Sequence, residues 1–319
     1  MKSRNTAKSI VFAVAGLLTA GAPFFSARGE DKRAPAPKFS ANSTKGIFFD
    51  SVKDAVRGER PTLQSLRKKT PVQVATTDAT PGGGEAVTGS GPWDKMITAT
   101  SIEDEIKRVK LHYDSVVTQP GAFKSGGYED ARRDLMVMSS LFAIISEYGG
   151  DVRWKKDAAV ARDLFGRTAF NCNAGSTQVF NEASARKDDL QDLISGTGLR
   201  EGKAQESNDW ASIADRTPLM EYADVLKEQL RRATSSADDV KAEPNDVRRP
   251  AELIAVLGKI LVQEGMDEAD DADYVAFSEK MTKASRSVIT ALERDDYDAI
   301  GKAVGAVTQS CDDCHGTYR

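Results

Sequence analysis

The chain has 319 residues, of which 40% are hydrophobic, so it is long enough to hold two domains with apolar cores. Its 44 basic and 48 acidic residues leave a net charge of −4, a balance that gives no reason to expect nucleic acid as a partner. The sequence has two histidines, no Gly-rich phosphate loop and no Ser/His/Asp constellation. We therefore do not expect an enzyme.

The N-terminal segment, residues 1–29, has the pattern of a secretory signal peptide. Basic residues precede an apolar run over 10–22, and small residues then place a cut near Ala27 or Gly29. Because the run is shorter than the roughly 20 residues that span a bilayer, cleavage is favoured over a permanent anchor. No later segment could cross a membrane. We predict an exported protein, periplasmic or extracytoplasmic, without a membrane span after cleavage.

Residues 30–97 are rich in Pro, Gly, Thr and Ser, a composition typical of a flexible linker. One short amphipathic piece at 46–57 carries apolar residues on one side. We interpret the segment as a linker with one short helix.

Residues 98–200 are predicted to form a helical bundle. Ser101 with Asp104 resembles a capping box that begins its first helix. Four stretches then carry apolar residues at alternating steps of three and four, the seam of helices packed nearly antiparallel. Cys172 falls on the apolar stripe of the third helix, which indicates a buried and inert thiol.

A polar break at 195–208 separates this bundle from a second one at 206–319. Its first helix is predicted to begin near Trp210, and a charged loop ends at Pro250, in the first turn of the next helix. Two further helices follow, the last one opened by a tight turn at 294–296. The predicted fold is all-α: two consecutive four-helix bundles.

The last of these helices ends in Cys311-Asp-Asp-Cys314-His315, the C-x-x-C-H attachment signature of haem c. Two thiols three residues apart share one helix face and can add to the two vinyl groups of one porphyrin. His315, four residues after Cys311, shares that face and can coordinate the iron. The motif predicts one covalently attached haem, which would face the bundle core.

Three other interpretations compete with haem. A zinc site needs about four protein ligands. The only cysteine and the only histidine outside the motif are Cys172 and His112, which lie on other predicted helices. A thioredoxin-type redox pair requires a βαβ context, which is absent. A structural disulfide leaves His315 unexplained.

The C-terminal residues 270–319 resemble cytochrome c-prime and its low-spin relatives, the class II c-type cytochromes, with an extra haem-less bundle before them. In these exported four-helix bundles, the haem motif at the end of the last helix usually reads C-x-x-C-H-x-x-Y-R. Tyr318 and Arg319 complete that pattern here, so the resemblance adds Arg319 to the haem-binding candidates. Since c-type haem is attached outside the cytoplasm, the resemblance agrees with export.

The resemblance also implies residues on the first helix of the haem bundle. Members of the family carry an arginine near a haem propionate and, four residues later, the side chain over the distal face. Arg216 and Met220 have this spacing, which implies Arg216 as propionate contact and Met220 as sixth iron ligand. Arg108 and His112 have the same spacing in the first bundle, so His112 or no sixth ligand stay open. Neighbouring helices usually pack together, which favours Met220.

These features predict an exported monohaem c-type cytochrome that carries single electrons to redox partner proteins. The alternative is a haem protein that binds nitric oxide or carbon monoxide at an open distal face. The haem-less bundle could in either case dock a partner. A homodimer is also compatible with the sequence.

Overall fold

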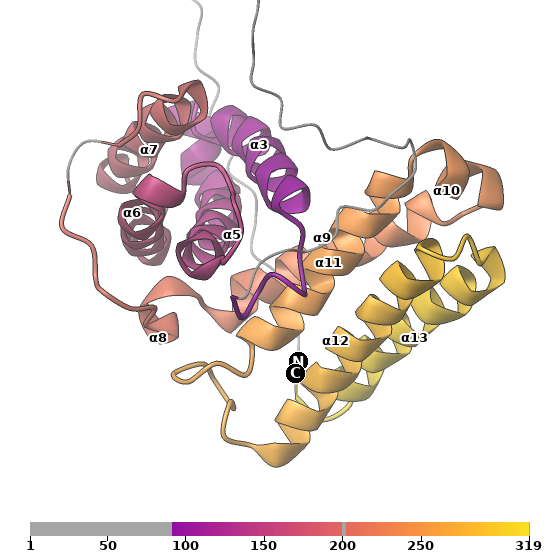
Figure 1. Cartoon of the computed structure of the whole chain (residues 1–319). Coiled ribbons are helices and arrows are strands. Elements are labelled where there is room, and N and C mark those ends of the chain that lie inside the picture. Colours follow the sequence, from indigo (N-terminus) through magenta and orange to yellow (C-terminus); the bar gives the residue numbers. More distant parts are fainter. Residues whose placement is uncertain (1–90, 200–201, 319) are drawn as a thin grey trace, which may run out of the picture. The chain divides into compact units, whose positions relative to one another are not determined.

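The computed structural model describes residues 91–199 and 202–318, which all belong to one compact unit. Their regular structure is entirely helical, without a strand in either range, which confirms the predicted all-α fold (Figure 1). The predicted signal peptide at 1–29, the short helix at 46–57 and Arg319 lie outside the described residues.

The first set of helices covers residues 99–195. Its four long helices are α3 (Ala99–Val116), α5 (Tyr128–Glu147), α6 (Ala158–Asn171) and α7 (Thr177–Ser195). Short turns join them: α4 (Pro120–Ala122), the π-helical turn η1 (Phe123–Gly127) and the 3₁₀ turn η2 (Lys155–Asp157). The C-cap of α6, Cys172, is buried as predicted.

The start of α3 corrects one prediction. Thr98, and not Ser101, is the N-cap, and its hydroxyl accepts a hydrogen bond from the Ser101 amide at 3.2 Å. Glu252, 154 residues further along the chain, accepts from the Thr98 hydroxyl at 3.0 Å. A tertiary contact therefore places the helix start, and the sequence pattern alone could not show it.

The second set of helices covers residues 210–315. Its four long helices are α9 (Arg216–Ala233), α11 (Pro244–Ile260), α12 (Ala272–Leu292) and α13 (Tyr297–His315). Two short ones are α8 (Trp210–Ile213) and α10 (Ala237–Ala242).

Two boundaries in the second set differ from the prediction. The helix expected from Trp210 is broken in two, because Asp215 leaves the helical conformation and caps α9 through the Thr217 amide at 3.0 Å. The charged segment expected as a loop before Pro250 contains α10 and the beginning of α11. Pro244 takes the first position of α11, where a missing amide costs nothing, and Pro250 lies buried inside that helix.

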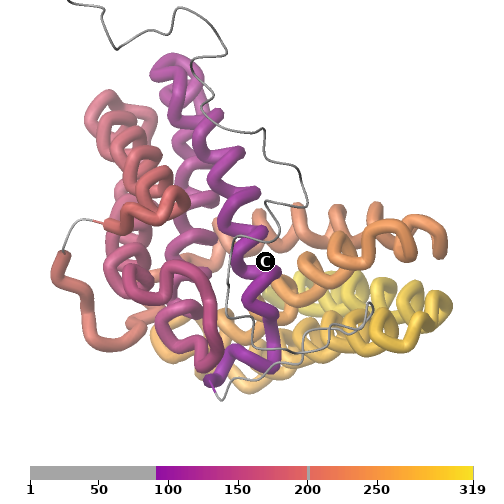
Figure 2. Tube along the Cα trace, turned by 45° about the horizontal axis from the view of Figure 1, so that its top comes forward, coloured from indigo at the N-terminus to yellow at the C-terminus, as the bar shows by residue number. Residues whose placement is uncertain are grey.

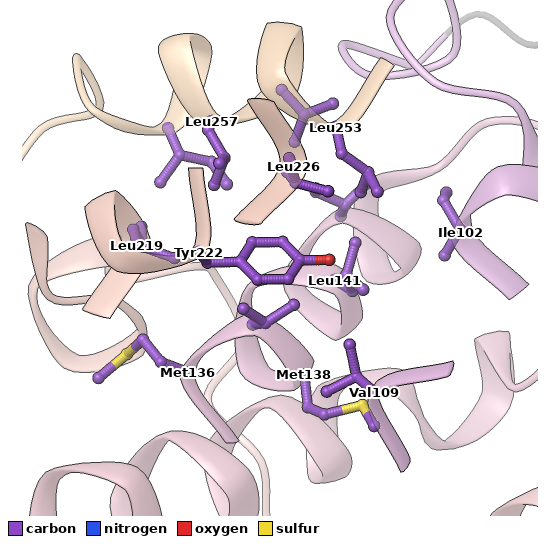
Figure 3. Close-up of a cluster of buried hydrophobic side chains, with 14 of the residues drawn as sticks. Ile102, Val109, Met136, Met138, Leu141, Leu219, Tyr222, Leu226, Leu253 and Leu257 are labelled. Carbon is purple, nitrogen blue, oxygen red and sulfur yellow. The ribbon is translucent and has the colours of Figure 1, made fainter. Parts of the chain in front are cut away.

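The two sets share one apolar core. Residues 134–145 of α5 are buried without interruption, so this helix is covered on all sides. Leu219, Tyr222 and Leu226 of α9 lie among Met136, Met138 and Leu141 of α5 (Figure 3). In two views, α9 and α11 lie beside α5 and α3 (Figures 1 and 2). The core is thus continuous from the first set to α9 and α11.

A glycine permits the close approach of α11 and α12. A Cβ at Gly258 would lie 2.4 Å from the Thr282 hydroxyl oxygen and 2.8 Å from the Ser278 carbonyl oxygen. We expect Gly258→Ala to lower the free energy of unfolding by about 1–3 kcal/mol, since overpacking outweighs the gain in helix propensity. Denaturant unfolding measures this loss. Gly301, in α13, has nothing within 4 Å of such a Cβ. The control Gly301→Ala should therefore stabilise the protein by about 0.5–1 kcal/mol, and equal effects of the two would contradict the packing argument.

Candidate haem site

A cavity of about 480 Å³ lies between α9, α12 and α13. It brings together both motif cysteines, His315, Arg216 and Met220, five of the six residues predicted to hold haem. The sixth, Arg319, is outside the described residues. The lining residues are Arg216, Thr217, Met220, Ala223, Asp224, Leu261, Tyr274, Phe277, Ser278, Met281, Ser310, Cys311, Cys314, His315 and Tyr318.

Helix α13 positions the motif. The Asp296 carboxylate accepts from the Ala299 amide at 3.0 Å and starts the helix, which continues without a break to His315. Its buried seam of Ile300, Ala303, Val307 and Ser310 faces α12 and the core. Cys311 and Cys314 extend this seam as half-buried residues, and His315 is exposed. The two thiols share a helix face, as the spacing predicts, and they are free rather than joined in a disulfide.

The surroundings keep both motif thiols protonated. Burial raises the pKa of Cys311, and the positive charge of Lys227 partly offsets this effect. Burial also raises the pKa of Cys314, which lies near the Arg216 guanidinium.

These shifts predict slow alkylation in the haem-free protein. At pH 8.5 iodoacetamide should modify Cys311 and Cys314 more slowly than it modifies free cysteine, because the thiolate is the reactive form. Cys172, whose pKa burial raises to about 12, should react slowest. Mass spectrometry of timed samples measures the three rates. Denaturant should bring all three to the same rate, and fast native alkylation of Cys311 would contradict the prediction.

Arg216 gives one end of the cavity a positive charge, and Tyr274 lies beside it. Arg216 is the first residue of α9, and its guanidinium lies 6.0 Å from the centre of the Tyr274 ring. Tyr274 is 2% exposed, and burial raises its pKa, so its hydroxyl remains a donor. Pro218, two residues further on, fits because amides in the first turn of a helix have no helical partner.

Tyr318 fixes the end of α13 against the beginning of α12. Its ring packs edge-on against Tyr274, with centroids 5.1 Å apart, and against Phe277 at 6.2 Å. Asp271 accepts a hydrogen bond from Tyr318 and also caps α12. Burial, followed by this carboxylate, raises the pKa of Tyr318 to about 12. The turn that follows His315 is thereby held in place.

The two candidates for the distal ligand, Met220 and His112, differ in their position relative to the cavity. Met220 is half-buried and lines the cavity from α9. His112 lies on α3, outside the lining, and its ring Nδ1 is 2.6 Å from the Asp134 carboxylate. That hydrogen bond raises the pKa of His112. A second methionine, Met281 of α12, also lines the cavity and was missed by the sequence analysis, although the seam of α12 includes it.

The lining fits the chemistry of haem. Two free thiols and an imidazole lie together at α13, aromatic and aliphatic side chains such as Phe277, Met281 and Leu261 supply apolar surface, and Arg216 supplies a cation for a carboxylate. A volume of about 480 Å³ also falls within the range of cofactor cavities. Among the described side chains, no group of three or more His, Cys, Asp or Glu residues could hold a bare metal ion.

The helices α9, α12 and α13 thus enclose a cavity at which the C-x-x-C-H motif lies. Residues 269–319, which include α12 and α13, match the family of cytochrome c-prime. The C-terminal part of this chain is therefore cytochrome c-prime-like, and the family match implies a c-type cytochrome that binds haem c with its iron. Neither the curated proteins nor the solved structures contain a match to the chain. None of the described helices is long and apolar enough to cross a membrane.

Proposed function

We propose that this protein is an exported monohaem c-type cytochrome that transfers single electrons between redox partner proteins and is not an enzyme. Cys311 and Cys314 would hold the haem through two thioether bonds, and His315 would coordinate its iron. Bound haem supplies an iron that changes between two oxidation states. Arg216 would contact a haem propionate; Arg319, which the resemblance also implies as a haem-binding residue, lies outside the described residues.

The observation that carries electron transfer is the position of Met220. It lines the cavity from α9, while the motif lines it from α13, which supports its thioether as the sixth ligand. A haem with two protein ligands exchanges electrons without a change of ligand, whereas an open distal face binds gases. The export part of the proposal is supported by the pattern of residues 1–29 and by the extracytoplasmic attachment of c-type haem.

The visible spectrum of the haem-loaded protein, oxidised and reduced, tests the proposal. We expect a low-spin spectrum that Met220→Ala converts towards high-spin, because the iron loses its sixth ligand. Met281→Ala is the matched control, since Met281 lines the same cavity from α12, and it should leave the spin state unchanged. A spectrum altered by His112→Ala instead would assign the distal ligand to α3. A high-spin wild type would favour nitric oxide or carbon monoxide binding.

A further inference from the structure

Helix α9, which carries Met220, lines the cavity with one face and packs into the core with the other. Arg216, Met220 and Asp224, at steps of four, line the cavity. Leu219, Tyr222 and Leu226 are buried on the other side, where Tyr222 lies near Leu141 of α5 and Leu226 near Leu253 of α11 (Figure 3). Since successive helical residues are about 100° apart, Tyr222 lies roughly opposite Met220 around the helix. Whatever holds Tyr222 therefore also sets the position of Met220.

Tyr222 is held by a buried carboxylate from the first bundle. Glu105 of α3 is fully buried and accepts a hydrogen bond from the Tyr222 hydroxyl. Arg108 donates from Nε to the same carboxylate at 2.9 Å, and the Arg249 guanidinium of α11 lies 3.4 Å from it. Burial raises the pKa of Tyr222, so its proton stays in place. A buried charge is tolerated only with such a set of partners, so the geometry is closely specified.

A second connection joins the first bundle to the beginning of α9. Arg132 of α5 forms an ion pair with Asp215, the N-cap residue directly before Arg216. On the other side α9 also contacts α13, but Arg216, Met220 and Asp224 line the cavity there. The position of α9 therefore depends on α3 and α5 of the first set of helices as well as on α11.

We infer that the haem-less first bundle, helices α3 to α7, positions α9. Glu105 and Tyr222 are the positioning residues for the distal face of the haem site. The inference rests on the proposed haem function, and it gives the first bundle a role. The bundle sets the distance between residue 220 and the iron, and thereby the spin state and the affinity for an added ligand.

Tyr222→Phe in the full-length protein tests this role, since it removes only the hydroxyl. We expect a change in the low-spin fraction and a change of about fivefold in carbon monoxide affinity, the size that one net hydrogen bond produces. The control is Tyr113→Phe. Tyr113 lies on α3 and is buried like Tyr222, but its hydroxyl donates to the Ala183 carbonyl at 2.6 Å, within the first bundle. It should leave both values unchanged.

A second pair of variants covers the case in which Tyr222→Phe does not fold. Arg132→Ala breaks the connection to Asp215 and should change the same two readouts, whereas Arg133→Ala breaks a pair with Asp130 inside α5 and should not. Equal effects of test and control variants, or no effect of the test variants, would overturn the inference.

Hydrogen exchange in the haem-free chain separates this inference from the proposed function. Faster exchange over residues 216–224 in Tyr222→Phe but not in Tyr113→Phe supports the positioning role, and unchanged exchange overturns it. A wild type that binds no haem would refute the proposed function, while the exchange result would still decide the role of the first bundle.

Discussion

Replacing both Cys311 and Cys314 by serine is expected to remove all covalently bound haem, so that none stays with the protein after denaturing extraction. A serine hydroxyl does not add to a vinyl group under the conditions in which a thiol does, so no covalent bond would hold the porphyrin. Each single variant keeps one thioether and should retain haem in smaller yield. Acid–acetone extraction followed by the absorbance of the protein pellet measures the retained fraction, and the intact mass shows whether one porphyrin is attached.

Cys172→Ser is the control for this experiment. Cys172 is 1% exposed and lies at the end of α6, outside the cavity lining. It should keep its haem and lose stability instead, because a hydroxyl replaces a thiol in an apolar site. Porphyrin retained by the double serine variant would show that the motif does not attach haem, and would return the disulfide and zinc interpretations to consideration.

Glu105→Ala is expected to lower the free energy of unfolding by about 3–5 kcal/mol, the usual effect of removing one partner from a buried ionic network. Arg108 and Arg249 would lose their counter-charge, and the Tyr222 hydroxyl would lose its acceptor. Because the carboxylate connects α3 to α9 and α11, we expect the described helices to unfold in one transition in the wild type. Urea unfolding followed by circular dichroism measures both quantities.

Asp104→Ala provides the matched control on the neighbouring residue. Asp104 pairs with Lys107 within α3, and both side chains are more than 40% exposed. Such a surface pair contributes about 0–1 kcal/mol. A loss of stability for Glu105→Ala that is no larger than this would mean that the buried network does not connect the two sets of helices.

The local parts of the site could be predicted because they depend on helix geometry alone. The motif residues Cys311, Cys314 and His315 share one face because their spacing matches the turn of a helix. The seams of α5, α12 and α13 follow from apolar residues at steps of three and four. The four-residue spacing of Arg216 and Met220 likewise places both side chains on one face of α9, the face that lines the cavity.

Other features depend on contacts between distant segments. Nothing in the sequence near Tyr274 marks it as a partner of Arg216, or Tyr318 as a partner of Asp271. The break before α9, the helix α10 in the charged segment and Pro250 inside α11 were all missed. In each case local propensity is a weak preference, and packing of the whole chain overrides it.

The sequence by itself determined the helical fold class and the arrangement of the thiols and the imidazole on α13, since these depend on residues at most a turn or two apart. Only the tertiary structure decided which distal candidate lies at the cavity and how the two bundles are joined. His112 and Met220 have equal spacing from an arginine, but His112 pairs with Asp134 outside the cavity. The buried carboxylate of Glu105 joins α3 to α9 across more than a hundred residues, because its charge must find partners wherever the fold provides them.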